Sequence, residues 1–188
     1  MNDALVEGPD GRLRCWWGAS SPEYAAYHDD EWGRPVRSAH ALYEKLCLEA
    51  FQSGLSWITI LRKREGFRAA FAGFDPRLVA DFGDDDVARL MADVSIVRNR
   101  AKIEAAIANA RAALTVDLSE LLWSFAPPAR PRPVDRAGVP ALTDESKAMA
   151  KALKQHGFKF VGPTTAYALM QACGLVDDHI EGCCVPAA

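Results

Sequence analysis

The sequence has no long apolar run and no excess of positive charge. A membrane-spanning helix needs roughly 18 uninterrupted apolar residues, and no stretch of the 188 residues comes near that length. We therefore expect no membrane partner. The formal net charge of −3 argues against nonspecific polyanion binding but allows a local basic face. The N-terminal stretch MNDALVEGPDGR lacks the apolar core of a secretory signal. We therefore expect a frayed segment over residues 1–13 and a single cytoplasmic domain over residues 14–188.

The alternating pattern of β-strands is also missing, and helix signals take its place. Ser21 followed by Pro22 is typical of an N-cap and a first helical residue. Ser38, Ser56 and Thr143 precede further helical patterns. The stretch from Ala126 to Pro140 contains five prolines and cannot be a regular helix. The sequence thus predicts an all-α fold with an irregular connection over about residues 126–141.

Cysteine is scarce, and most of it lies with histidine near the two chain ends. Cys15 and His28 are close to one end, and His179 and Cys183 are close to the other. Two thiolates and two imidazoles suit a tetrahedral Zn²⁺ site, which would be structural because four protein ligands leave no open position. Cys184 could replace Cys183, and a Cys15–Cys183 disulfide is the alternative. The odd count of five cysteines and the absence of a secretory signal favour a reducing compartment and hence zinc.

One carboxylate falls on an apolar helix face. Glu49 follows Leu42 and Leu46 at helical spacing and precedes Ser53 on the same stripe. A carboxylate in that position must be paired, protonated or functional. The structural interpretation is an ion pair with a basic side chain of the next helix, such as Arg62, Lys63 or Arg64.

Aromatic residues cluster in the sequence around this carboxylate and the first metal half-site. Aromatic side chains more often pack in the core than bind a ligand. Their rings can, however, also stack on a nucleobase and attract a cationic one. A neighbouring carboxylate accepts hydrogen bonds from an exocyclic amine. The candidate base-binding residues are Glu49, Trp57, Tyr27, Tyr24, Trp17 and Trp32.

Two turns are candidates for DNA contact. The segment His156 to Ala166 joins two helices across about residues 147–173 in a helix-hairpin-helix pattern. Gly162 would let a phosphate approach the N-terminus of the helix that opens with Thr164 and Thr165, near Lys159. The alternative is an ordinary corner between helices. In the second turn, Gly54 and the apolar Leu55 form an exposed corner. Leu55 could fill the gap left by a base that swings out of a duplex, or it could simply cover the core.

Together these residues resemble the DNA-3-methyladenine glycosylase I family of bacterial base-excision repair. The resemblance covers about Arg14 to Cys184 in many separate segments. The matching stretches are Cys15 to Gly18, Tyr24 to Gly33, Leu48 to Glu49, Gln52 to Leu61, Lys63 to Glu65, Arg98 to Ile103, Trp123 to Phe125, Gly157 to Gly162, Gln171 to Val176, Asp178 to His179, and Cys183.

The resemblance implies a helix-hairpin-helix glycosylase fold and the activity that goes with it. A monofunctional enzyme of this kind would hydrolyse the N-glycosidic bond of 3-methyladenine in double-stranded alkylated DNA. Free 3-methyladenine and an abasic site would be the products, and 3-methylguanine a weaker substrate. The family further implies a monomer that acts on the bacterial nucleoid. An inactive damaged-DNA-binding module and an enzyme with an open zinc position are the alternatives.

The resemblance also assigns roles to residues. It implies that zinc is bound by Cys15, His28, His179 and Cys183. It implies that the excised base is contacted by Glu49, Trp57, Tyr27 and Tyr24, in a cavity walled by Trp17 and Trp32. It also implies that Leu55 is a wedge in the DNA. Related glycosylases that also cleave the strand have a hairpin lysine where this chain has Thr164. Asp177 is similar to an aspartate that such relatives carry after the hairpin, and it is a second catalytic candidate. It could instead cap a helix end near the metal.

Overall fold

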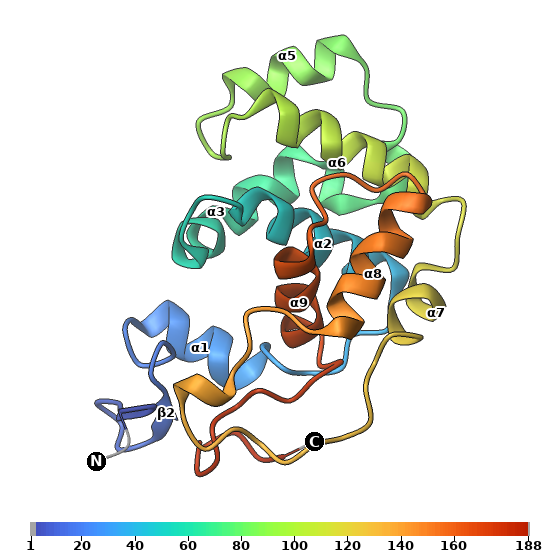
Figure 1. Ribbon diagram of the computed structural model, residues 1–188. Coiled ribbons are helices and arrows are strands. Elements are labelled where there is room, and N and C mark those ends of the chain that lie inside the picture. The colour runs from blue at the N-terminus through green and yellow to red at the C-terminus, as the bar shows by residue number, and fades with distance from the viewer. Residues whose placement is uncertain (1–2, 188) are drawn as a thin grey trace.

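A computed structural model describes residues 3–187 of the chain (Figure 1). Its strands are β1 (Leu5–Glu7) and β2 (Leu13–Cys15). Its α-helices are α1 (Pro22–Asp30), α2 (Ala39–Gln52), α3 (Trp57–Ala70), α4 (Pro76–Val79), α5 (Asp84–Ala92), α6 (Arg100–Ala113), α7 (Leu118–Trp123), α8 (Asp144–Gln155) and α9 (Pro163–Ala172). Two short 3₁₀ turns, η1 (Ala72–Phe74) and η2 (Arg136–Gly138), complete the described elements. The prediction of a helical fold is confirmed.

The helices begin at the residues that the sequence indicates. The Ser21 hydroxyl accepts a hydrogen bond from the Tyr24 amide, and Pro22 is the first residue of α1. Thr143 caps α8 through a reciprocal pair of hydrogen bonds with Ser146. Each such N-cap contributes about 1 kcal/mol by satisfying an amide that has no partner within the helix.

Helix α2 forms the centre of the molecule and packs against α3, α6, α7 and α9. Leu42, Leu46 and Phe51 on α2 are almost fully buried in the main core. Figure 1 shows α5 and α6 at one end of the molecule, and the N-terminal strands, α1 and the segment after α9 at the other. The two chain ends therefore meet at one place beside α1.

The expected frayed N-terminus is wrong for the residues that the structure describes. β1 and β2 form an antiparallel hairpin that pairs Leu5 with Cys15. Gly11, at a φ of 73°, closes the turn between them. Strands of three residues are too short to show an alternating pattern, and burial of Ala4 beside Cys15 and Ile180 holds them in place. Residues 1–2 lie outside the described residues.

The proline-rich connection is irregular as expected, apart from η2. Arginines fasten it to the two chain ends: Arg132 pairs with Asp177, and Arg136 donates to the Asp3 carbonyl. No local pattern predicted the short helix α4 or the turn η1. None of the helices in residues 3–187 has the length and apolar character needed to cross a bilayer.

Candidate active site and metal centre

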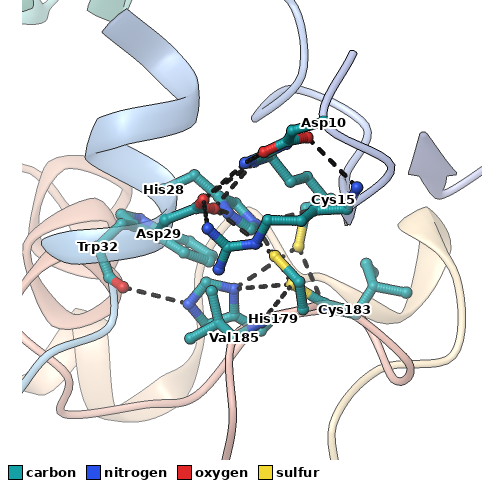
Figure 2. A network of polar contacts seen from close by, with 12 residues as sticks. Asp10, Cys15, His28, Asp29, Trp32, His179, Cys183 and Val185 are labelled. Atoms are coloured by element: carbon teal, nitrogen blue, oxygen red, sulfur yellow. Dashed lines mark hydrogen bonds and ion pairs between the residues drawn. The ribbon is translucent and has the colours of Figure 1, made fainter. Parts of the chain in front are cut away.

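Four predicted ligands from the two chain ends come together beside α1. Cys15 ends β2, His28 lies on α1, and His179 and Cys183 follow α9. One donor atom from each of the four lies within 4.8 Å of every other. The side chains point toward a common centre in Figure 2. Three of the four residues are buried, so the donors are shielded from water.

The distances within this cluster fit a tetrahedral metal site. The Cys183 Sγ lies 3.4 Å from His28 Nε2 and 3.6 Å from His179 Nδ1, and the Cys15 Sγ lies 3.8 Å from His179 Nδ1. Usual Zn–S and Zn–N bond lengths at a tetrahedral angle place sulfur and nitrogen about 3.6 Å apart. The backbone amides of Ile180 and Val185 also point at the two sulfurs, which stabilises thiolates.

Each histidine of the cluster is oriented through its second ring nitrogen. His28 donates from Nδ1 to the Asp29 carboxylate over 2.8 Å, and His179 donates from Nε2 to the Trp32 carbonyl over 3.1 Å. Both bonds are drawn in Figure 2. These partners fix the tautomers so that the lone pairs of His28 Nε2 and His179 Nδ1 face the cluster, where His28 Nε2 also accepts a hydrogen bond from the Cys15 amide over 3.3 Å.

The Asp29 carboxylate is itself held in place by charge. Arg14 reaches it through Nε and Nη2 at distances of 3.0 and 2.7 Å, and Arg12 forms a further ion pair. Arg14 also pairs with Asp10 in the turn between the strands. The N-terminal hairpin therefore holds Asp29 in place, and through Asp29 it holds the His28 ring.

All five cysteines, which lie within the described residues, are free in the structure. Cys184 is not among the four donors: its Sγ lies 3.7 Å from an Asp29 oxygen, in a second group with Asp29 and His28. The geometry therefore favours Cys183 over Cys184 as the fourth donor, and gives a group that could hold a metal ion.

The aromatic residues of the sequence analysis surround a cavity of about 310 Å³. Its lining includes Trp17, Tyr24, Tyr27, Trp32, Glu49 and Trp57, together with Trp16, Gln52, Val139, Pro140, Ala168 and Gln171. α1 contributes the tyrosines, α2 contributes Glu49, and α3 begins with Trp57. All six predicted base-binding residues therefore meet in one place.

The aromatic rings that line this cavity pack against one another in edge-on and tilted arrangements. Trp17 contacts Tyr24 and Trp32 edge-on, with centroids 5.7 and 5.0 Å apart. Tyr27 and Trp57 are tilted, with centroids 5.3 Å apart. The Tyr24 hydroxyl accepts a hydrogen bond from the Ile58 amide, which ties α1 to the start of α3. The Trp57 indole N–H is buried and has no hydrogen-bond partner among the described residues.

Glu49 is the one carboxylate in the lining of this cavity. Its residue is 6% exposed, and no hydrogen bond to its side chain is formed within residues 3–187. Burial raises the pKa of Glu49 to about 8, an effect that the charge of Lys45 partly offsets. The structural alternative of an ion pair with α3 does not hold in the structure, because Arg62 pairs with Glu23 and Arg64 pairs with Glu31. Lys63 donates to the Val94 carbonyl.

A second hollow of about 300 Å³ extends from Glu49 toward the surface. Gly54, Leu55, Thr164 and Thr165 line it, so the two predicted DNA-contacting turns meet at its rim. Leu55 is 42% exposed, and Gly54 has a φ of 79° that only glycine adopts without strain. The exposed position of Leu55 agrees with a wedge rather than with a cover for the core.

The turn between α8 and α9 is clamped by a buried amide. Asn109 on α6 donates to the Lys159 carbonyl and accepts from the Lys159 amide, at 3.1 and 2.7 Å. Gly162 is the N-cap of α9, and a Cβ there would meet no atom within 4 Å. The N-terminal amides of α9 are thus open to an approaching anion. A shallow groove beside them is lined by Lys147, Lys151 and Lys154.

The structure does not bring Asp177 to the cavity. Its carboxylate pairs with Arg132 over 2.8 Å and accepts from the His179 amide over 3.2 Å. It is absent from the described lining of both hollows. Asp177 also caps no described helix end, which was the alternative interpretation; it orders the segment that carries His179.

Sequence reasoning missed half of the cavity lining. Val139 and Pro140 come from the irregular connection, and Ala168 and Gln171 come from one face of α9. Nothing local marks the first two, because their position depends on how the connection wraps the chain ends. The motif from Gln171 to Val176 was recognised, but its pattern does not indicate which residue faces the cavity.

Comparisons with known proteins agree with this geometry. The sequence matches the family Methyladenine glycosylase over residues 16–186. It is 48% identical to DNA-3-methyladenine glycosylase 1 of Escherichia coli, covering 91% of this chain and 95% of that protein. It is 46% identical to DNA-3-methyladenine glycosylase of Haemophilus influenzae, covering 90% and 96%.

Comparison with solved structures points to the same family. A crystal structure of 3-methyladenine DNA glycosylase I superposes with a TM-score of 0.89 at 48% identity, covering 92% of this chain and all (100%) of that one. The Staphylococcus aureus 3-methyladenine DNA glycosylase I, whose structure addresses recognition of 3-methyladenine, superposes with a TM-score of 0.87 at 36% identity, covering 91% and 95%. The resemblance noted in the sequence is confirmed, and the chain belongs to the methyladenine glycosylase family.

Proposed function

We propose that this protein is a DNA glycosylase that releases 3-methyladenine from alkylated double-stranded DNA. The observation that carries the proposal is Glu49, a carboxylate without a hydrogen-bond partner among the described residues, at the wall of an aromatic cavity. Aromatic faces and a carboxylate together favour a flat cation. The names of the relatives, both 3-methyladenine glycosylases, point to the same substrate and do not favour an inactive DNA-binding module.

The chemistry follows from the charge of the lesion. Methylation at N3 makes the adenine of DNA cationic, so its bond to the sugar is weak. When that bond breaks, its electron pair stays with the base and neutralises it. Water adds to the sugar carbon and loses a proton, which leaves an abasic site. The protein therefore has to extract, hold and discriminate the base more than it has to activate it.

Glu49 would supply the discrimination between the cation and ordinary adenine. A carboxyl group with a pKa of about 8 is mostly protonated near neutral pH in the free protein. A cationic base in the cavity lowers that pKa by direct attraction, so that the carboxylate and the cation form a pair shielded from water. Neutral adenine gains no such attraction, and the rings of Tyr27, Tyr24 and Trp57 would add stacking to both.

DNA would bind across the rim where the two turns meet. We propose that α8, the turn after it and α9 act as a helix-hairpin-helix unit, with Gly162, Thr164 and Thr165 near a phosphate and Lys159 close by. The open N-terminus of α9 supports this assignment. Leu55 with Gly54 would fill the space that the extracted nucleotide leaves. The hairpin carries Thr164 and no lysine in that position, so we expect no strand cleavage and a monofunctional enzyme.

We propose that the Cys/His cluster holds a structural Zn²⁺ ion. The metal would supply folding free energy and fix Cys15, His28, His179 and Cys183 in one place. All four donors would be used, so the ion would have no position for substrate, and the alternative of an open catalytic zinc is not supported. Trp17 and Trp32 would join the metal centre to the cavity wall. We propose that residues 14–188 and the N-terminal hairpin packed on them form one domain, and that the protein acts as a monomer on cytoplasmic nucleoid DNA.

Chromatography of the bases released from methylated duplex DNA tests the function. We expect free 3-methyladenine, with 3-methylguanine released more slowly, and an abasic strand that stays uncut until treated with alkali. Strand cleavage without alkali would contradict the monofunctional assignment. Tight binding to abasic DNA without release of any base would instead identify a damaged-DNA-binding module.

A further inference from the structure

A buried carboxylate lies behind the cavity and takes no part in the chemistry described above. The side chain of Asp178 is 0% exposed. Its Oδ1 accepts from Arg130 at 2.6 Å, and its Oδ2 accepts from the Tyr167 hydroxyl at 2.6 Å and from Gln171 Nε2 at 2.8 Å. Arg130 also donates to the Tyr167 hydroxyl. Both oxygens are therefore occupied, and the group joins the irregular connection to α9.

This network fixes which way the Gln171 amide points. A carboxylate only accepts hydrogen bonds, so the amide nitrogen of Gln171 has to face Asp178. The carbonyl oxygen Oε1 is then directed to the other side, and no described residue donates to it. Gln171 lines the cavity that Glu49 lines from α2. With Nε2 held by Asp178, Oε1 is the atom of Gln171 that remains available as a second acceptor at the cavity wall.

We propose that Gln171 is a specificity residue that favours adenine over guanine lesions, with Asp178 as the residue that positions it. The inference rests on the proposed function and names how that site selects its purine. The exocyclic amine of adenine carries two hydrogens, of which Glu49 takes one and Gln171 Oε1 takes the other. Guanine has a carbonyl oxygen in the same place, and that oxygen would face Gln171 Oε1 without a hydrogen between them.

The preference arises from the hydrogen bond that adenine gains and from the penalty on the wrong base. A buried acceptor left unpaired costs about 1–3 kcal/mol, which corresponds to roughly a 5- to 150-fold difference in rate or affinity. The rigid support matters because a free glutamine could turn its amide nitrogen toward a guanine oxygen and satisfy it. Asp178 prevents that rotation, since it would lose the hydrogen bond from Nε2.

The experiment measures release of both bases from one sample of methylated DNA. Wild type is compared with Gln171→Met, which keeps side-chain length but removes the amide, and with Glu65→Met, an exposed side chain of the same length on α3, as the control. We expect Gln171→Met to lower kcat/KM for 3-methyladenine about 10-fold and to leave that for 3-methylguanine unchanged or higher. The ratio of kcat/KM for 3-methyladenine to that for 3-methylguanine falls about 10-fold or more, whereas Glu65→Met keeps this ratio.

A second variant tests the role of Asp178. In Asp178→Asn the Gln171 amide can turn, so the ratio moves in the same direction as in Gln171→Met. Thermal unfolding and zinc content are measured on the same preparation, because His179 is adjacent. An equal loss for both bases in Gln171→Met, or an unchanged ratio in either variant with intact zinc, overturns the inference. Failure of wild type to release any base overturns the proposed function itself, and the two results are distinct.

Discussion

Trp17 packs edge-on against His28, with ring centroids 5.1 Å apart. The same indole lines the cavity that Glu49 faces. Trp32 repeats the arrangement, with its ring 4.7 Å from that of His179 and its carbonyl accepting from the same imidazole. The Cys/His cluster is therefore not remote from the aromatic cavity, because two tryptophans belong to the surroundings of both.

Removal of the metal should destabilise the fold and loosen the cavity wall. We expect Cys183→Ala to lose bound zinc and to melt at least about 10 °C below wild type, since a closed metal site contributes folding free energy. Affinity for free 3-methyladenine, followed by tryptophan fluorescence, should fall as well. Zinc content, calorimetry and fluorescence titration measure the three effects.

The neighbouring cysteine is the matched control for this experiment. Cys184→Ala should keep zinc and melt close to wild type, because its sulfur lies beside Asp29 and is not one of the four donors that converge. A protein that melts lower on addition of a reductant, but not of a chelator, would contain the Cys15–Cys183 disulfide instead of a zinc centre.

Ionisation of Glu49 should make stability fall with rising pH. The folded-state pKa of Glu49 is raised to about 8 by burial, whereas an exposed glutamate titrates near about 4.3. Between these values the unfolded chain has released a proton that the folded chain retains. The stabilisation is complete below about pH 4 and is lost as pH rises through about 8, by up to about 5 kcal/mol.

Urea unfolding at pH 5 and pH 8.5 measures this dependence. Glu49→Gln should remove most of the slope, so the variant gains stability relative to wild type as pH rises. Glu65→Gln, which changes a largely exposed carboxylate on α3, should keep the slope of wild type. Equal slopes in wild type and Glu49→Gln would show that Glu49 ionises as freely as a surface residue.

The exposed Leu55 should matter for duplex DNA and not for the free base. Leu55→Ala removes the apolar group that replaces the extracted nucleotide, so we expect excision from duplex DNA to fall about 10-fold. Binding of free 3-methyladenine should stay the same. Leu78→Ala, which truncates an equally exposed leucine on α4, is the control. Loss of free-base binding in Leu55→Ala would indicate that this residue supports the core.

Helix α6 holds both turns that we propose to contact DNA, through the two buried polar residues Lys102 and Asn109. Lys102 donates to the carbonyls of Phe51 and Ser53, and Asn109, two helical turns later, clamps Lys159. We expect Lys102→Met to leave those carbonyls unpaired and to weaken binding to abasic DNA about 10-fold. Affinity for the free base should not change. Fluorescence anisotropy measures binding to abasic DNA, and tryptophan quenching measures affinity for the free base. As a control, Lys63→Met removes a similar lysine-to-carbonyl contact on α3.

The sequence predicted local structure well because caps act locally. Ser21, Ser38 and Thr143 each accept a hydrogen bond from a backbone amide at a helix start, as their position indicated. Glu49 could be singled out because helical spacing alone places a carboxylate on an apolar face. The N-terminal strands were missed, since they are held by contacts with residues more than 160 positions away, such as the bond from Cys184 to the Leu13 carbonyl.

Contacts between residues far apart in the sequence also explain why some residues of the candidate site could not be predicted. Val139 and Pro140 reach the cavity only because arginines of the connection bind the segment after α9. Asp177 and Asp178 are adjacent in sequence, yet one pairs at the surface with Arg132 and the other is fully buried behind Gln171. No local pattern separates them, because their difference arises from tertiary packing.

Excision by Glu49→Gln, compared with its binding to abasic DNA, tests the central claim most directly. Gln keeps the size of the side chain and removes the negative charge that would pair with a cationic base. We expect single-turnover release of 3-methyladenine to fall at least about 100-fold, while affinity for an abasic duplex stays within about threefold of wild type. Release at the wild-type rate, or an equal loss of release and of abasic-DNA binding, would contradict the account.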